Sequence, residues 1–250
     1  MRRRLLIGAC AAALALPGCG GSSSGGRPSL DVAAAASLQR AFAQIASGFR
    51  PARVRLSFAG SDQLAAQIEA GARPDVYAAA NEALPRALFA KGLVERPVVF
   101  ARNRLVLAVP ARGARVHSLA GLGRPGVTLA IGSPSVPVGA YTRAVLARLP
   151  AAQRRAILAR VRTEEPDVSG IVGKLAAGAV DAGFVYASDV RAADLRLRAI
   201  ALPARLEPVV RYDVAVVRGT PHPGAARAFV AALRSPAGRR VLVGDGFLAP

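Results

Sequence analysis

Short apolar runs that alternate with amphipathic helical stretches constrain the fold of this chain more than any other feature of its sequence. Leu30–Ala34 is typical of a buried strand, and the segment 38–49 keeps its large apolar residues on one helical face. Arg53–Phe58 then alternates like a second strand and leads to a helix that ends at Gly71. The repeated order of strand and helix predicts βαβ units and therefore an α/β fold.

The same alternation continues to the end of the chain and suggests two lobes. Its 250 residues allow either one large domain or two modest ones. Further strands are expected at 75–79, 104–110, 128–131, 182–186 and 212–217, and further helices near 81–92, 139–149, 169–177 and 223–233. A late strand that returns to the first lobe is what paired hinge strands require. We therefore expect lobe 1 to comprise residues 29–101 and 210–250, and lobe 2 to comprise residues 102–209.

The first residues have the pattern of an export signal. Arg2–Arg4 supply positive charge, and the apolar run 5–16 is too short to span a bilayer as a helix, which needs roughly 20 residues. Residues 1–18 are therefore expected to be a signal peptide. The ending Leu-Pro-Gly-Cys resembles a bacterial lipobox, which implies a lipid anchor at Cys19 and a place on the periplasmic or extracellular face of a membrane. A plain secretory signal with an incidental Cys is the alternative.

A flexible tether and a strongly basic composition follow this signal. Residues 19–28 are rich in Gly and Ser, which is typical of a linker. The formal charge of +19 raises nucleic-acid binding as an idea. Lys91 and Lys174 are the only lysines, however, and no basic block interleaves with aromatic residues. We therefore expect no nucleic-acid partner, although a charge-driven binder of an anionic polymer or lipid surface stays open as an alternative.

The sequence is poorly supplied with catalytic groups. His117 and His222 lie in expected loops, and no nucleophile elbow, zinc-protease motif or Walker loop occurs. The adjacent pair Glu164-Glu165 is more typical of a solvated surface than of an acid/base dyad. No Cys/His cluster offers a protein-ligated metal site. We therefore expect a binding protein without a cofactor rather than an enzyme.

Two serines follow consecutive expected strands at the points where helices should begin. Ser37 and Ser61 are each predicted to be helix N-caps, and the residues three further on, Arg40 and Leu64, form no capping box with them. A helix N-terminus offers free N–H groups and a partial positive charge, so it attracts anions. The carboxyl ends of neighbouring strands are also where open α/β sheets bind ligands. Together the serines predict an anion site.

Five segments in a fixed order resemble the periplasmic molybdate-binding proteins of ABC transporters, over residues 30–250. They are Ala33-Ala34-Ala35-Ala36-Ser37-Leu38, Phe58-Ala59-Gly60-Ser61, Gly71-Ala72-Arg73-Pro74-Asp75-Val76-Tyr77, Ser135-Val136-Pro137-Val138-Gly139 and 181–189, the last beginning Asp-Ala-Gly-Phe-Val-Tyr. The resemblance implies a type II periplasmic-binding fold, in which two lobes, each a mixed sheet flanked by helices, hold the ligand in the cleft between them.

The same resemblance implies a ligand and the residues that hold it. Molybdate or tungstate would be bound by neutral donors: Ser37 and Ser61 through hydroxyl and amide, Val138 and Val168 through backbone N–H groups, and Tyr186 through its phenol. It also implies an ABC permease as partner, and we expect a monomer. A binding protein for sulfate or another small oxyanion is an alternative, and an enzyme using the same cleft is a weaker one.

Two residues depart from the pattern of that family. Val138 stands where a smaller residue is common, and Asp62 places a carboxylate beside Ser61 that would repel a dianion if it faced inward. Because a residue one past the N-cap can point outward, we expect the Asp62 side chain to face solvent.

Overall fold

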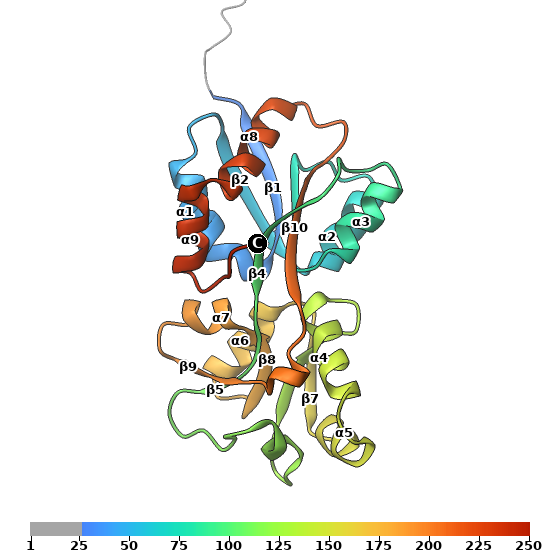
Figure 1. Ribbon diagram of the computed structural model, residues 1–250, viewed down its shortest axis with the longest axis vertical. Coiled ribbons are helices and arrows are strands. Elements are labelled where there is room, and N and C mark those ends of the chain that lie inside the picture. Colours follow the sequence, from blue (N-terminus) through green and yellow to red (C-terminus); the bar gives the residue numbers. More distant parts are fainter. Residues whose placement is uncertain (1–26) are drawn as a thin grey trace, which may run out of the picture.

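The computed structural model describes residues 27–250, which form two lobes stacked along the long axis of the molecule (Figure 1). Each lobe contains a five-stranded mixed sheet with helices packed against it, as the sequence predicted. The expected signal peptide 1–18, the expected lipid attachment at Cys19 and most of the expected tether lie outside the described residues.

The first lobe is built on a sheet of strand order β2-β1-β3-β10-β4. Its strands are β1 (Ser29–Ala35), β2 (Arg53–Ala59), β3 (Val76–Ala79), β4 (Val98–Asn103) and β10 (Val210–Val216), and its helices are α1 (Gln39–Gly48), α2 (Ser61–Glu69), α3 (Ala83–Ala90), α8 (Pro223–Arg234) and α9 (Pro236–Gly244). Strands β2 and β3 pair parallel with β1, whereas β10 is antiparallel to both of its neighbours. Phe42 centres the core, with its ring 5.8 Å from those of Phe100 and Phe229.

The second lobe has the strand order β7-β6-β8-β5-β9. Its strands are β5 (Leu105–Pro110), β6 (Leu129–Gly132), β7 (Val161–Glu165), β8 (Ala182–Tyr186) and β9 (Leu197–Ala201), and its helices are α4 (Pro137–Ala147), α5 (Ala151–Leu158), α6 (Val168–Ala176) and α7 (Ala187–Ala192). Short 3₁₀ turns lie at η1 (Ala36–Leu38), η2 (Leu119–Gly123) and η3 (Ala204–Leu206). Strands β7 and β8 pair parallel with β6, and β5 is antiparallel to β8 and β9.

The described chain passes between the lobes at two neighbouring places. Strand β4 belongs to the first sheet through Asn103, and β5 of the second sheet begins at Leu105, so the first crossing lies beyond the expected boundary at residues 101 and 102. The second crossing leads from β9 to β10, which pairs with β4 (Figure 1). Two paired strands that carry both crossings form a hinge about which lobes can rotate.

The carboxyl ends of the parallel strands in both sheets face the junction between the lobes. The register of β1 with β2 sets Ala35 beside Ala59, so both strands end at the same edge, where η1 and α2 begin. In the other lobe, α4 follows β6 and α6 follows β7 toward the same junction. Within residues 27–250, no helix combines the length and apolar character needed to cross a bilayer.

Candidate ligand site between the lobes

A small cavity of about 10 Å³ lies between the lobes and is lined by residues from both of them. The five residues named from the sequence all line it: Ser37, Ser61, Val138, Val168 and Tyr186. These residues are up to 149 positions apart in the sequence. They meet at the cavity because the two sheets face each other across the hinge. Gly60, Ala80 and Asp167 also line the cavity.

Ser61 is the first residue of α2, and Gly60 is the N-cap. The expectation that Ser61 caps the helix is therefore wrong. Its Oγ instead accepts a hydrogen bond from the Ala80 backbone N–H at 3.1 Å, while its carbonyl accepts one from the Tyr77 hydroxyl at 2.7 Å. These contacts fix the buried Ser61 side chain at the end of β3. Since its oxygen is already an acceptor, its hydroxyl hydrogen is available to the cavity.

Ser37 lies inside the 3₁₀ turn η1, and α1 begins two residues later at Gln39. The expectation that Ser37 is the N-cap of this helix is wrong as well, because the turn separates the strand from the α-helix. The Ser37 Oγ lies 2.9 Å from the hydroxyl of Tyr212 on β10. The backbone turn therefore places Ser37 beside the cavity, and a side chain from the hinge strand holds its hydroxyl.

In the second lobe, two helices begin at the cavity. Pro137 and Val138 are the first residues of α4, and Pro fits the first position because its missing N–H would have had no partner in the helix. A Cβ on Gly139 would collide with the carbonyl oxygens of Ser133 and Gly132, so glycine permits α4 to start close to β6. Val168 begins α6, and the preceding Asp167 accepts a hydrogen bond from the Gly170 N–H at 3.1 Å.

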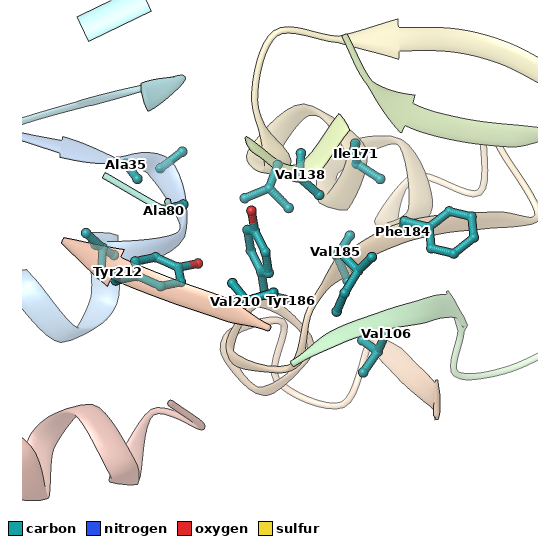
Figure 2. Close-up of a cluster of buried hydrophobic side chains, with 14 of the residues drawn as sticks. Ala35, Ala80, Val106, Val138, Ile171, Phe184, Val185, Tyr186, Val210 and Tyr212 are labelled. Atoms are coloured by element: carbon teal, nitrogen blue, oxygen red, sulfur yellow. The ribbon is translucent and has the colours of Figure 1, made fainter. Parts of the chain in front are cut away.

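Tyr186 brings a buried hydroxyl to the same cavity. It ends β8 and is 1% exposed, and its hydroxyl has no hydrogen-bond partner among residues 27–250. Figure 2 shows this hydroxyl directed toward Val138, with Ala35 and Ala80 of the first lobe across the cavity. Burial raises the pKa of Tyr186 well above its ordinary value, so the group keeps its proton. A buried donor without a partner is costly, which marks this position as one for a ligand.

Asp62 faces solvent only in part. The residue is half-buried, and its Oδ1 is buried without a hydrogen-bond partner in residues 27–250. A Cβ placed on Gly60 would lie 2.8 Å from that oxygen, which shows that the carboxylate folds back over the first turn of α2. The positive end of the helix dipole stabilises a negative charge there. Asp62 is not among the residues that line the cavity in the described part of the chain.

The donors around the cavity are neutral. Within residues 27–250 the lining contains no Lys, Arg or His, and its single carboxylate, Asp167, caps α6. The first amides of α2, α4 and α6 have no intrahelical acceptors. Hydroxyls and helix N-termini of this kind bind an anion without a cationic side chain. No group of three or more His, Cys, Asp or Glu in the described residues is arranged to hold a metal ion.

Three polar residues behind the cavity were missed from the sequence. Asn103 ends β4, Tyr212 lies in β10, and Asp189 lies in the first turn of α7, where its Oδ2 accepts a hydrogen bond from the Tyr186 N–H at 2.8 Å. For Asn103 and Tyr212 the available signal was a polar residue in or beside a predicted hinge strand. Strand patterns alone do not show which of these residues is buried.

A two-lobe α/β molecule, with paired hinge strands and a cavity between the lobes that is lined by donors from both of them, has the architecture of a solute-binding protein. Residues 30–248 match the bacterial extracellular solute-binding protein family, and the chain belongs to that family. It is 35% identical over 249 residues to the molybdate-binding protein ModA of Mycobacterium tuberculosis, a match that covers 94% of this chain and 93% of that protein.

Two solved structures share the fold. The periplasmic molybdate-binding protein of Azotobacter vinelandii superposes with a TM-score of 0.80 at 23% identity, covering 88% of this chain and 99% of that one. The sulfate-binding protein SubI of Mycobacterium tuberculosis superposes with a TM-score of 0.76 at 17% identity, covering 88% of this chain and 86% of that one. At these identities the likeness establishes the fold alone.

Proposed function

We propose that this protein captures molybdate, or the nearly isosteric tungstate, between its lobes and delivers it to the permease of an ABC importer. The observation that carries the proposal is the meeting of Ser37, Ser61 and Tyr186 with the N-termini of α4 and α6 at one cavity that spans both lobes. The similarity to ModA proteins over nearly the whole chain supports molybdate as the ligand. In this assignment Val138 and Val168 contribute backbone N–H groups.

The strength of neutral donors is sufficient for this task. A hydrogen bond to a charged partner contributes roughly 1.5 to 3 kcal/mol. About seven such bonds give on the order of 10 to 20 kcal/mol, against an association cost of at least about 4 kcal/mol. A dissociation constant between about micromolar and nanomolar, equivalent to roughly 8 to 12 kcal/mol, lies within this surplus. Because each donor is fixed by the fold, the site measures the size of the anion rather than its basicity.

Titration calorimetry with molybdate, tungstate, sulfate and phosphate tests the assignment. Molybdate and tungstate should bind with similar affinity. Sulfate has the same charge and shape but shorter bonds, so it leaves several donors stretched, each at a cost of about 1 kcal/mol or more. A sulfate affinity equal to that of molybdate would replace the specific assignment by the sulfate alternative. Conversion of the bound anion would favour an enzyme, although within the described residues neither histidine lines the cavity.

The proposal includes the place of the protein in the cell. Cys19 would carry lipid and hold a monomeric binding protein at the membrane that contains its permease, on the periplasmic or extracellular side. The lipobox-like sequence that ends at Cys19 supports this anchor. Cys19→Ser should release the protein into the soluble fraction. Mass spectrometry that finds an unmodified mature N-terminus in the unaltered protein would remove the anchor from the proposal and leave ligand capture intact.

A further inference from the structure

A chain of buried side-chain hydrogen bonds connects the hinge to the candidate site. Asn103 lies 4% exposed at the end of β4, and Tyr212 is fully buried on the adjacent strand β10. The Asn103 Nδ2 is 2.8 Å from the Ser188 Oγ of α7 and 3.5 Å from the Tyr212 Oη. The Tyr212 Oη is in turn 2.9 Å from the Ser37 Oγ. The chain therefore joins both lobes and ends at a serine that lines the cavity.

The orientation of the Asn103 amide is fixed by its other contact. Its Oδ1 accepts a hydrogen bond from the Arg104 backbone N–H at 2.9 Å. A backbone N–H only donates, so the acceptor oxygen of the amide must lie on that side. The NH₂ group consequently faces Ser188 and Tyr212, and an amide nitrogen can only donate.

This orientation gives the chain one direction. Because Asn103 donates toward the Tyr212 Oη, the Tyr212 hydrogen is left for the Ser37 Oγ. Ser37 then accepts from Tyr212, and its own hydrogen is free to point into the cavity. A hydroxyl group by itself can serve as donor or acceptor, so without this chain Ser37 could present either a hydrogen or a lone pair to a ligand.

We propose that Asn103 and Tyr212 are positioning residues that fix Ser37 as a hydrogen-bond donor, so that the site selects an anion that carries acceptors only. A fully deprotonated oxyanion such as molybdate meets this requirement, whereas inorganic phosphate at neutral pH carries a proton that needs an acceptor. The inference rests on the proposed function and extends it to the protonation state of the ligand.

A double-mutant cycle on the full chain separates positioning from simple packing. Tyr212→Phe keeps a ring that packs edge-on against Phe100, Tyr186 and Phe247 and removes only the hydroxyl. By calorimetry it should weaken molybdate binding about tenfold, the loss expected for one oriented donor to a charged ligand. Combined with Ser37→Ala, it should cause less than about a twofold further loss, because its effect acts through Ser37.

Ser61→Ala provides the matched control. Ser61 lines the same cavity, but its Oγ is held by the Ala80 N–H rather than by the chain. Tyr212→Phe should therefore keep its full tenfold effect in a Ser61→Ala background. Phosphate binding should fall less than molybdate binding in Tyr212→Phe, because a freely rotating Ser37 hydroxyl can accept as well as donate. Thermal unfolding midpoints of every variant show whether each one is folded.

Two results would overturn the inference. The first is an unchanged molybdate affinity in Tyr212→Phe. The second is a loss of affinity from Tyr212→Phe that is equally large with Ser37 and with Ser37→Ala. If Tyr212→Phe does not fold, Asn103→Ala replaces it in the cycle. Its loss of molybdate affinity should disappear in a Ser37→Ala background, and a loss that persists there would also overturn the inference. If the unaltered protein binds sulfate instead of molybdate, the proposed function fails, while the same cycle performed with sulfate still tests the positioning role.

Discussion

Two buried tyrosine hydroxyl groups meet at the junction of the lobes. Tyr186 and Tyr212 stand with their ring centroids 5.8 Å apart and at 70° to each other. Their hydroxyls differ in surroundings: that of Tyr212 is bonded to the Ser37 Oγ, whereas that of Tyr186 lacks a partner in residues 27–250. We therefore expect the two tyrosines to have different tasks: Tyr212 would orient a donor, and Tyr186 would itself donate to the ligand.

Tyr186→Phe tests that difference at the level of one atom. Removal of a donor to a buried dianion should weaken molybdate binding by roughly 1.5 to 3 kcal/mol, or about 10- to 150-fold. The stability of the ligand-free protein should stay the same or rise, because an unsatisfied buried hydroxyl is lost. Titration calorimetry and thermal unfolding measure the two effects. Tyr141→Phe, on α4 but outside the cavity lining, is the control, and an equal loss of affinity there would contradict the role of Tyr186.

The buried carboxyl of Asp189 should make stability depend on pH. Desolvation raises the pKa of Asp189 to about 7, and the charge of Asp167 adds to this, while the hydrogen bond from the Tyr186 N–H opposes it. The folded state thus holds this proton more tightly than the unfolded state, whose Asp has a pKa of about 4. The contribution of Asp189 to stability is therefore greatest at low pH and falls as the pH rises from about 4 to about 7.

Asp189→Asn should flatten this dependence. The Asn oxygen can still accept from the Tyr186 N–H, but no buried charge forms, so the thermal midpoint at pH 8 should exceed that of the unaltered protein. Midpoints measured from pH 4 to pH 8 provide the comparison. Asp213, with a pKa raised to about 6 by desolvation and the charge of Glu82, continues to titrate in the variant. Parallel curves for both proteins would show that Asp189 is not responsible.

At the scale of elements, the helix starts determine how closely the lobes approach. Gly60 precedes α2, and a Cβ there would lie 2.5 Å from the carbonyl oxygen of Pro166 in the other lobe. The backbone of Gly60 has φ −58° and ψ 137°, a conformation that alanine adopts readily. The absence of a side chain is therefore needed for the contact between lobes rather than for the turn.

Gly60→Ala should consequently impair closure without preventing folding. Overpacking typically costs about 1 to 3 kcal/mol, so molybdate affinity should fall about tenfold or more. The thermal midpoint without ligand should change little, since the open form relieves the collision. Gly224→Ala on α8, where a Cβ has no neighbour within 4 Å, is the matched control. A drop in midpoint without a drop in affinity would place the strain inside the first lobe instead.

Periodicity predicted the elements well but not the roles of residues at their ends. The apolar alternation of 53–58 and the helical face of 38–49 identified β2 and α1, because an element that buries one face spaces its apolar residues with its own period. Ser37 was misplaced as an N-cap because a 3₁₀ turn has no such pattern. Asn103 and Tyr212 were missed because their partners are distant in sequence: 85 positions separate Asn103 from Ser188, and 175 separate Ser37 from Tyr212. Contacts of this kind follow from the crossing of the lobes.

At the scale of the whole molecule, the lobes touch through weak polar contacts beyond the cavity. Arg40 of α1 binds Asp245 at 2.6 Å and reaches Asp194 of the second lobe at 3.9 Å. From the second lobe, the Arg191 Nε of α7 donates to the Gly244 carbonyl of α9 in the first lobe at 2.5 Å. Exposed ion pairs contribute little, at most about 1 kcal/mol each. A ligand that binds both lobes adds to the contact of Tyr186 with Tyr212 across the junction, so ligand affinity and closure should be coupled.

This coupling predicts a large and selective thermal shift. A ligand at 100 times its dissociation constant stabilises the folded state by about 2.7 kcal/mol. For a chain of 150 to 250 residues each kcal/mol raises the midpoint by roughly 2 to 4 °C, so molybdate should raise it by about 5 to 10 °C. Sulfate at the same concentration should produce a much smaller shift, because a poorly filled cavity holds the lobes less firmly. Gly60→Ala, measured at the same molybdate concentration, should lose about half of the shift or more, because a tenfold weaker ligand stabilises by only about 1.4 kcal/mol, whereas Gly224→Ala should keep it. Equal shifts in both glycine variants would mean that the anion binds one lobe alone and that closure contributes nothing to its capture.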